Sequence, residues 1–525
     1  MSTVRNVLFI MADQLRWDYL SCYGRSPVAT PNIDRIAARG IRFDRAYCNS
    51  PVCGPSRMSF YTGRTAFSHG ASWNFVPLPA HEWTLGDYLE PTGARVALVG
   101  KTHMMPDFEG LKRLGVDPRA DLGVHWAQCG FEPYERDDGV HPAGKFDPDL
   151  RYNRWLRERG YAGANPWHDY ANSALGPNAE VLSGWSLRHA RLPARVAEEH
   201  SETAYMTDRA LQFVRETGDK PWVLHLSYIK PHWPLMAPAP YHALFGPDDV
   251  PPPVRSEAER GQAHPVVGAF MGMECSQTYS DESMRRNIVP TYMGLIRQLD
   301  DHIGRLLDAL EQSGRIDDTA IILTSDHGDY LGDHWLGEKE LFHEASARIP
   351  FIISDPDAAA DTRRGSVDSR LVEAIDVVPT IMDWMGVDDP GQRLEGRSLV
   401  STLRGASQPG SQREAALSEI DYSFYRARLT LGIAPHQARA WMIRTDRWKY
   451  VYYKGFSPQL FDLREDPEEL VDLGRSVGLE TVRSDLQAML LDRLTDRRNR
   501  ITVSDKVVAE RTDGSERVGV VIGRW

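Results

Sequence analysis

The sequence predicts an α/β fold, with a large mixed, mostly parallel sheet sandwiched by helices and a smaller C-terminal α+β domain. Three observations support this prediction. Short apolar runs alternate with amphipathic helical segments along most of the chain, an order typical of a doubly wound sheet. The 525 residues, 42% of them hydrophobic, exceed what one core usually holds, so we expect two lobes. Near the C-terminus, residues 440–453 show an alternating pattern that is rich in aromatic β-formers, as antiparallel strands do.

Each element of the large sheet follows from a local pattern. The first apolar run, residues 7–12, predicts a buried strand. Thr30 and Pro31 mark the start of a helix and Gly40 its end, because proline is pre-organised for a first helical turn. Further strands are expected at residues 96–99, 222–228 and 320–324, and further helices at residues 85–89, 202–216 and 290–311.

Two stretches interrupt this alternation. Residues 106–198 lose periodicity and are rich in Trp, Tyr, Pro, Gly and charge, which predicts an insertion that shapes the mouth of a pocket. Residues 231–282 are also irregular and are expected to act as a second lid or binding loop. Residues 405–412 have the composition of a linker. We therefore expect a catalytic domain at residues 1–405 and a C-terminal antiparallel-sheet subdomain with a tail at residues 413–525.

Polar and ionisable residues follow the ends of the predicted strands. In open α/β sheets, ligands bind outside the carboxyl ends of the strands. These side chains are therefore expected to converge although they lie far apart in the sequence. The set comprises Asp13, Gln14, Lys101, His103, His232, Asp326 and His327.

The most informative segment is Cys53-Gly54-Pro55-Ser56-Arg57. Proline places it at the start of a short helix, whose free N–H groups and dipole favour an anion or a polarised oxygen beside residue 53. Arg57 follows one turn later on the same face. The same field would activate a plain thiol, so a nucleophilic cysteine and a modified cysteine both fit this segment.

The wider run at residues 50–57, Ser-Pro-Val-Cys-Gly-Pro-Ser-Arg, with Thr-Gly-Arg at residues 62–64, resembles the signature of the sulfatases. These enzymes are the formylglycine-dependent branch of the alkaline phosphatase superfamily. Residues 460–469 resemble the L-F-D-L-x-x-D-P-x-E element of the C-terminal sulfatase domain, so the resemblance covers most of the chain. It implies an alkaline phosphatase-like fold and a sulfuric ester hydrolase close to the arylsulfatase and phosphonate monoester hydrolase subgroup. It also implies that a formylglycine-generating enzyme oxidises Cys53 to an aldehyde.

The resemblance implies one divalent metal ion at the strand ends, with Asp13, Gln14, Cys53, Asp326 and His327 as its ligands. Sulfatases usually carry a second Asp in place of Gln14 and often Asn in place of His327. The loss of a negative charge and the gain of a nitrogen donor make Mn²⁺ the preferred metal, with Ca²⁺ as the alternative. This Gln and His pair resembles the phosphonate monoester hydrolases. Taken alone, Asp326-His327 would fit a helix cap with a solvated histidine.

Basic side chains are expected around the transferred group, because its oxygens stay charged through the transition state. Residues 99–103, Val-Gly-Lys-Thr-His, resemble the G-K-x-H element of sulfatases, whereas phosphonate hydrolases carry neutral hydroxyls there, which favours a sulfate ester. Taken singly, each of these Lys and Arg residues would fit a solvent-exposed surface position, and each His an ordinary loop. His69 is expected only to brace a turn. The resemblance implies catalytic roles for Cys53, Arg57, Lys101, His103, His232 and Lys339, and substrate binding by Asn74, Lys101, His232 and Lys339.

The implied mechanism starts from the hydrated formylglycine at position 53, a metal-bound geminal diol. One hydroxyl attacks sulfur in line, with Asp326 accepting its proton, and a covalent hemiacetal ester forms. His232 together with Lys339 supplies a proton to the leaving alcohol. His103 then takes the proton of the second hydroxyl, which expels sulfate and regenerates the aldehyde.

Three functions remain open on these residues. The first is hydrolysis of small sulfate monoesters, including aromatic ones. The second is a phosphonate monoester or phosphodiester hydrolase with the same nucleophile and promiscuous sulfatase activity, which Gln14 and His327 favour; relative turnover of aryl sulfate and aryl phosphonate separates the two. The third is an idle binding protein, although neither the nucleophile nor a metal ligand is missing. The net charge of −12 argues against a nucleic-acid partner.

The five cysteines are odd in number, scattered and without metal-ligand spacing, which favours a reducing compartment and predicts a cytoplasmic protein. Residues 1–12 lack a small-residue cleavage site and lead directly into Asp13, so they predict a strand rather than a signal peptide. No apolar stretch approaches membrane-spanning length. Residues 518–525 form an apolar run that a partner subunit could cover, so we expect a homo-oligomer, either a dimer or a tetramer.

Overall fold

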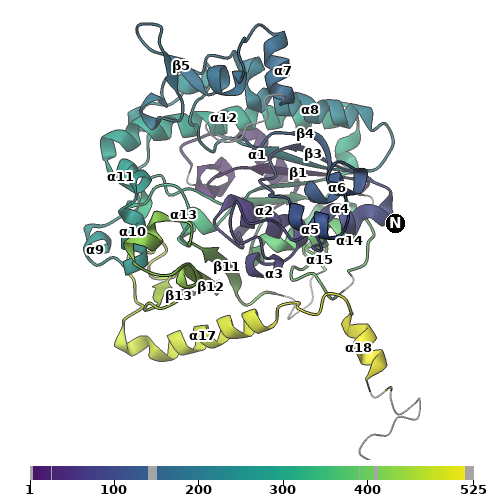
Figure 1. The fold of residues 1–525 in the computed structure, drawn as a ribbon, viewed down its shortest axis with the longest axis vertical. Coiled ribbons are helices and arrows are strands. Elements are labelled where there is room, and N and C mark those ends of the chain that lie inside the picture. Colours follow the sequence, from purple (N-terminus) through teal and green to yellow (C-terminus); the bar gives the residue numbers. More distant parts are fainter. Residues whose placement is uncertain are drawn as a thin grey trace, which may run out of the picture.

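The computed structural model describes residues 4–24, 26–139, 150–389, 391–406, 412–512 and 514. An eight-stranded sheet with helices on both faces forms its centre, and a four-stranded antiparallel sheet lies beside it (Figure 1). The mixed, mostly parallel sheet and the smaller C-terminal sheet predicted from the sequence are confirmed.

In the large sheet, β9 pairs antiparallel with both of its neighbours, whereas the other pairs are parallel. Ala12, the last residue of β1, is in register with Tyr228 of β7 and Ser325 of β8. The carboxyl ends of the central strands therefore lie level, as the sequence predicts. Across the sheet, the order is β10 (Ser366–Glu373), β2 (Ile41–Tyr47), β9 (Phe351–Ser354), β8 (Thr319–Ser325), β1 (Asn6–Ala12), β7 (Trp222–Tyr228), β3 (Arg95–Gly100) and β4 (Glu132–Arg136).

Strand β1 shows how the sheet supports a core on each face. All of its residues are buried, and successive side chains point to opposite faces. Leu8 and Ile10 join the core under α8 (Glu202–Glu216) and α12 (Glu282–Gln312). Phe9 and Met11 join the core under α2 (Cys53–Thr62) and α14 (Val377–Trp384). A strand buried on both sides reads as a continuous apolar run, which is why the sequence revealed it.

The helices include two long ones on one face of the sheet, α8 and α12 (Figure 1). They are α1 (Pro31–Arg39), α2 (Cys53–Thr62), α3 (Ala66–His69), α4 (Leu85–Leu89), α5 (Phe108–Arg113), α6 (Asp121–Ala127), α7 (Arg151–Glu158), α8 (Glu202–Glu216), α9 (Glu257–Gly261), α10 (Pro265–Met271), α11 (Glu274–Ser280), α12 (Glu282–Gln312), α13 (Glu344–Ala347), α14 (Val377–Trp384), α15 (Val400–Leu403), α16 (Arg426–Thr430), α17 (Glu480–Thr495) and α18 (Asp505–Arg511).

Two predictions about residues 231–311 are corrected. Helix α12 begins at Glu282 rather than near Pro290, because Asp281 caps it by accepting hydrogen bonds from Ser283 N and Met284 N. The proline lies inside the helix and is buried there. Part of the stretch at 231–282 is regular, since it contains α9, α10 and α11, which are too short for a periodic pattern to show in the sequence.

Residues 106–198 also contribute more to the fold than the sequence predicts. They supply α5, α6 and α7, a two-stranded sheet of β5 (Ser173–Leu175) and β6 (Val181–Ser183), and β4. Because β4 pairs parallel with β3 at the edge of the large sheet, this stretch is partly integral to the main fold. Its role in shaping a pocket mouth stays a prediction.

The C-terminal sheet packs against α17 through its own small core (Figure 1). The alternating run at 440–453 forms two strands of this sheet. Of the predicted linker at 405–412, residues 407–411 lie outside the described part of the chain. The apolar run at 518–525 lies outside it as well, so the homo-oligomer stays a prediction. In chain order, the strands are β11 (Ala416–Asp421), β12 (Arg439–Arg444), β13 (Trp448–Tyr453) and β14 (Gln459–Asp462).

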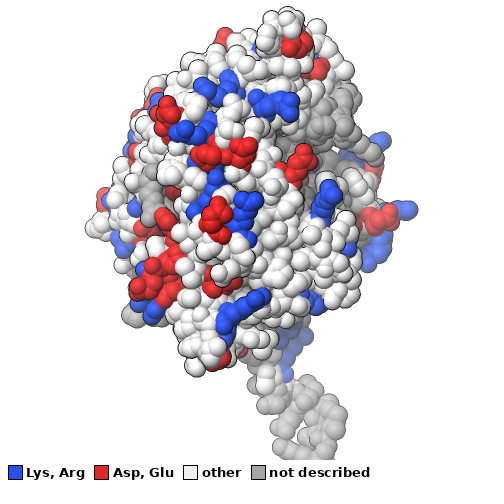
Figure 2. Space-filling view, turned by 90° about the vertical axis from the view of Figure 1, so that its left-hand side faces the viewer, with Lys and Arg blue, Asp and Glu red and all other residues white. Residues whose placement is uncertain are grey.

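None of the helices in the described residues combines the length and the apolar character that crossing a bilayer requires. All five cysteines are described, and each is a free thiol. On the face seen in Figure 2, acidic and basic side chains occur in small mixed groups.

Candidate active site

Cys53 is the first residue of α2, a helix whose ten residues are all buried. The N–H of Gly54 donates to Asn74 Oδ1 over 2.8 Å. A Cβ at position 54 would lie 2.9 Å from this oxygen and 3.0 Å from Asn74 Cα, so only glycine fits here. Gly63 ends the helix with φ of 68°. The helix begins at Cys53, as the helix-start pattern predicts, and its start is held by Asn74, whose expected role in substrate binding stays a prediction.

Four side chains with donor atoms meet beside the start of α2. Their donor atoms all lie within 4.8 Å of one another, and all four residues are buried. Cys53 Sγ lies 3.1 Å from His327 Nε2 and 3.8 Å from Asp13 Oδ1. In the family that the sequence resembles, an oxygen of formylglycine would take the place of this Sγ. The four residues are Asp13, Cys53, Asp326 and His327.

His327 is held in the form that binds a metal. Its Nδ1 lies 2.9 Å from the carbonyl oxygen of Gly328, so Nδ1 carries the proton and Nε2 presents a lone pair to Cys53 and Asp13. Burial lowers the pKa of this histidine, which keeps the ring neutral. Two carboxylates and a neutral imidazole fit a divalent cation with some tolerance for nitrogen.

Asp13 is kept ionised by the basic groups around it. Burial would raise its pKa, but the positive charges of Lys101 above all and of Arg57 hold the pKa well below its usual value. Lys101 Nζ donates directly to Asp13 Oδ2, and both side chains are buried. The residue after Asp13, Gln14, has a left-handed backbone with φ of 65°.

Arg57 connects the two carboxylates. Its Nε donates to Asp326 Oδ2 over 2.8 Å, and its Nη2 lies 3.3 Å from Asp13 Oδ2. Its Nη1 donates to Ser227 Oγ at 2.7 Å and to the carbonyl of Lys101 at 2.9 Å. The described contacts of this guanidinium therefore orient the carboxylates, and the expected catalytic role of Arg57 stays a prediction.

Gln14 has its amide oxygen turned towards the site. Its Nε2 donates to Asp329 Oδ2, and its Oε1 accepts from Lys339 Nζ at 2.9 Å. Its backbone N–H donates to Asp326 Oδ1 at 3.0 Å. Burial, together with Glu338, raises the pKa of Asp329 to about 7. Gln14 thus lies next to the four-donor cluster, with its oxygen held by the ammonium of Lys339.

Lys339 and His232 form a contact pair beside Gln14. Lys339 Nζ lies 3.3 Å from His232 Nε2, and His232 Nδ1 lies 2.6 Å from the carbonyl oxygen of Trp233. Burial, reinforced by Lys339, lowers the pKa of His232 well below its usual value. The ring is therefore neutral, with Nδ1 as donor and Nε2 as acceptor from the ammonium. Burial would lower the pKa of Lys339, but the nearby Cys53, Glu338 and Asp13 outweigh this effect and raise the pKa above its usual value.

His103 follows β3 with a left-handed φ of 53°. Its N–H donates to Asp138 Oδ1 at 3.0 Å, and its ring interacts with the side chain of Cys53. Its Nδ1 is buried without a hydrogen-bond partner among the described residues. Burial, reinforced by Lys101, lowers the pKa of His103. The side chain of His69 instead lies 3.2 Å from Ser59 Oγ and accepts from Ala71 N, which fits the bracing role.

The structure brings the predicted site residues into one region linked by these contacts, although their roles stay proposals. The sequence did not reveal six further residues in the same network. The spacing of Asp326 and Asp329 was a usable signal for one of them, and the Glu residues flanking Lys339 were another. The six are Ser227, Asp138, Asp329, Glu338, Glu340 and Tyr425.

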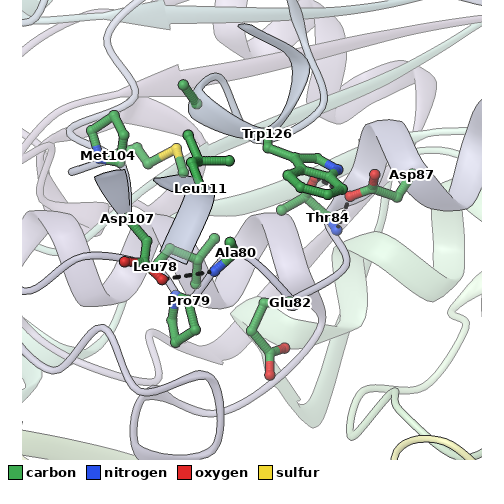
Figure 3. Close-up of a pocket in the computed structure, with 12 residues that line it drawn as sticks. Leu78, Pro79, Ala80, Glu82, Thr84, Asp87, Met104, Asp107, Leu111 and Trp126 are labelled. Carbon is green, nitrogen blue, oxygen red and sulfur yellow. Dashed lines mark hydrogen bonds between the residues drawn. The ribbon is translucent and has the colours of Figure 1, made fainter. Parts of the chain in front are cut away.

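A separate cavity lies between the loop before α4 and the helices α5 and α6 (Figure 3). Its volume of about 10 Å³ leaves room for about one water molecule. Asp107 and Asp87 accept backbone N–H groups at its edge, from Ala80 and Thr84 (Figure 3). None of the described residues that line it is a predicted site residue, so we assign it to packing rather than to substrate.

The sulfatase family model matches residues 5–387. The chain belongs to the sulfatase family. A second model, of the C-terminal part of N-sulphoglucosamine sulphohydrolase, matches residues 332–498 of this sulfatase. The expected family is therefore confirmed, including its C-terminal lobe.

Relatives of this sulfatase include hydrolases of more than one ester class. It is 34% identical to the multifunctional alkaline phosphatase superfamily protein PehA of Trinickia caryophylli, over 90% of this chain and 91% of that protein. It is 27% identical to an arylsulfatase of Clostridium perfringens, over 96% and 97% of the two chains. A phosphonate monoester hydrolase from Silicibacter pomeroyi superposes with a TM-score of 0.82 at 27% identity, covering 95% of this chain and 96% of the other. The alkaline phosphatase-like fold is thereby confirmed.

Proposed function

We propose that this sulfatase hydrolyses sulfate monoesters, in the manner of an arylsulfatase, through a formylglycine formed from Cys53. The observation that carries the proposal is the position of Cys53 Sγ, 3.1 Å from the unprotonated Nε2 of His327 and in the same buried cluster as Asp13 and Asp326. A reactive group here is surrounded by cation ligands and by ammonium and imidazole groups, which together suit attack on a tetrahedral anionic ester.

Asp13, Asp326 and His327 would hold one divalent ion, with Gln14 Oε1 as a further oxygen, and Mn²⁺ is preferred over Ca²⁺. When bound, this ion supplies positive charge that lowers the pKa of a hydroxyl and stabilises developing negative charge. The aldehyde at position 53, formed by a formylglycine-generating enzyme, supplies the attacking hydroxyl once it is hydrated. The free state of all five thiols supports maturation in the cytoplasm.

The side chains around this cluster divide the remaining tasks. Lys101 Nζ, bound to Asp13, faces the charge that the ester brings. Lys339 and His232 are the source of a proton for the leaving alcohol, because the ammonium already donates towards His232 Nε2. His103 accepts a proton, since its lowered pKa leaves the ring neutral near pH 7 and its Nδ1 is unpartnered among the described residues.

A phosphonate monoester or phosphodiester hydrolase is the second candidate. The Gln14 and His327 pair favours it, and the Silicibacter pomeroyi enzyme that superposes on this chain carries that name. One anion pocket stabilises either tetrahedral group, so side activity is expected in both cases. Lys101 and His103 beside Cys53 favour the sulfate ester as the main substrate.

The experiment combines mass spectrometry of the peptide containing residue 53 with activity assays. We expect an aldehyde at position 53, turnover of an aryl sulfate above that of an aryl phosphonate, and loss of both activities in Cys53→Ala. Cys22→Ala, which removes a half-buried free thiol elsewhere, is the matched control and is expected to stay active. Equal activity of the thiol and aldehyde forms would refute the mechanism.

A further inference from the structure

The segment Glu338-Lys339-Glu340 places a carboxylate residue on each side of Lys339, whose ammonium contacts the side chains of Gln14 and His232. Glu338 and Glu340 have φ of 66° and 88°, values that residues other than glycine rarely adopt. This backbone directs Lys339 Nζ to within 2.9 Å of Gln14 Oε1. The two glutamates therefore accompany the lysine into the site rather than following a regular strand or helix.

Each of these carboxylates is bound by the polar tip of an aromatic side chain. Trp233 Nε1 donates to Glu338 Oε2 over 2.9 Å, and Tyr425 Oη donates to Glu340 Oε1 over 2.7 Å. Trp233 comes from the loop after β7, next to His232. Tyr425 comes from the C-terminal lobe, between β11 and β12. Two distant parts of the chain thus each contribute an aromatic side chain that binds a carboxylate of this one segment.

Further aromatic rings extend both pairs. Trp185, in the stretch at 106–198, meets Trp233 edge-on with a centroid distance of 5.1 Å. Trp73 meets Tyr425 edge-on at 4.4 Å. Trp73 also precedes Asn74, whose side chain binds the residue after Cys53. Two groups of aromatic rings are therefore linked to the network around Cys53, one through Glu338 and the other through Asn74.

Glu338 is the carboxylate in this region that an incoming group can meet. Its side chain is 22% exposed, whereas that of Lys339 is 6% exposed and that of Asp13 is fully buried. Its Oε2 lies 3.6 Å from Lys339 Nζ, the proposed proton source for the leaving alcohol. A carboxylate beside aromatic faces attracts cations and repels anions.

We propose that the Trp233–Glu338 pair, together with the ring of Tyr425, forms the subsite for the leaving alcohol, with Glu338 as its charge. This subsite selects esters whose alcohol carries a positive charge, such as an amine or a quaternary ammonium, and it rejects alcohols with a further negative charge. This inference rests on the proposed sulfate-ester hydrolysis at Cys53 and adds the charge preference of its substrate.

The test uses the matured, aldehyde-bearing enzyme and three phenyl sulfates that differ only at the para position. One carries a trimethylammonium group, one a neutral acetyl group and one a carboxylate. The quantity measured is the ratio of kcat/KM for the cationic ester to kcat/KM for the anionic ester. We expect this ratio to fall about tenfold in Glu338→Gln, because one partly exposed charge is removed. Comparing variants cancels the intrinsic reactivity of each ester.

Two controls separate charge selection from other effects. Glu338→Asp keeps the charge and is expected to keep most of the ratio. Glu132→Gln changes the net charge equally but lies at the start of edge strand β4, away from the carboxyl ends, and is expected to leave the ratio unchanged.

A wild-type enzyme without preference for the cationic ester, or an equal loss on all three esters in Glu338→Gln, would overturn the inference and leave the proposed function standing. Failure of the wild type to hydrolyse even the neutral ester would instead overturn the proposed function.

Discussion

Arg57 and Asp326 form a fully buried ion pair in which Nε donates to Oδ2 over 2.8 Å. The same guanidinium lies 3.3 Å from Asp13, so it joins the residues that follow β1 and β8. Breaking a buried pair leaves an uncompensated charge, which costs far more than losing an exposed pair. Arg57 therefore both orients the carboxylates of the four-donor cluster and stabilises the fold at the ends of β1 and β8.

Arg57→Met is expected to lower the free energy of unfolding by about 3–5 kcal/mol, because Asp326 loses its partner and Asp13 loses one of its two cations. Arg57→Lys is expected to lose less, since the charge stays but the multiple hydrogen bonds do not. Urea denaturation measures both. The control is Arg39→Met, which removes a partly exposed pair with Asp317 and is expected to cost below about 1 kcal/mol. Similar costs for Arg57→Met and Arg39→Met would contradict this stabilising role.

Gly54→Ala is expected to lower kcat/KM about a hundredfold, because the new Cβ would meet Asn74 and displace the start of α2 by some tenths of an ångström or more. Steady-state kinetics with an aryl sulfate measures the effect. Gly478→Ala is the matched control, since nothing lies within 4 Å of a Cβ at that position. Unchanged kinetics in Gly54→Ala would show that the contact with Asn74 does not position the nucleophile.

His327→Asn is expected to change the metal preference. It replaces a nitrogen donor with an amide oxygen, so the amount of bound Mn²⁺ relative to Ca²⁺ should fall about tenfold or more. Elemental analysis of protein equilibrated with both ions measures this ratio without any assay of activity. His69→Asn, which alters another buried histidine outside the donor cluster, should leave the ratio unchanged. A preserved ratio in His327→Asn would argue against His327 as a ligand.

Lys449 of β13 links the C-terminal sheet to the large domain. Its Nζ lies 2.9 Å from Glu344 Oε1 and 2.6 Å from Glu469 Oε1. Burial would raise the pKa of Glu344, but Lys449 and Arg348 overcome it and lower the pKa to about 2. A depressed pKa stabilises the fold above the unfolded value of about 4.3, and this stability is lost as the pH falls towards 2. Burial raises the pKa of the neighbouring Glu469, which offsets part of this stability.

Lys449→Met is accordingly expected to cost about 3–5 kcal/mol at pH 7, where it leaves buried carboxylates without their cation. The cost should shrink as the pH falls below about 4, because the carboxyl groups of the variant then take up protons. Chemical denaturation at pH 7 and at pH 3.5 checks both statements. A cost that does not depend on pH would mean that Lys449 acts through packing alone.

The positions of the catalytic elements could be predicted because they depend on local patterns. The apolar run that forms β1 ends at Asp13, and the run that forms β8 ends at Asp326, so the sheet rule alone brings the two carboxylates together. The start of α2 followed from Pro55, and its end followed from Gly63. Predicting these features requires only the amino-acid sequence near each residue.

The contacts of Glu338 and Tyr425 could not be predicted, since they depend on tertiary packing. Glu338 adopts a backbone conformation that no sequence pattern of a glutamate indicates. Tyr425 reaches Glu340 across 85 residues, from a lobe whose position on the large domain is set by side-chain packing. The start of α12 could not be predicted for another reason, because proline is typical of a helix start whereas Pro290 lies inside this helix.

The hydrogen bond between Tyr425 and Glu340 means that the C-terminal lobe, which lies beside the large sheet, also reaches the segment that carries Lys339. In the proposed function, the groups around the sulfur atom come from the large domain, whereas Tyr425 of the proposed alcohol subsite comes from the lobe. Substrate range can therefore diverge between relatives through changes in the lobe while the reaction centre stays intact. Grafting the lobe of one relative onto another is a direct route to engineered enzymes with new ester preferences.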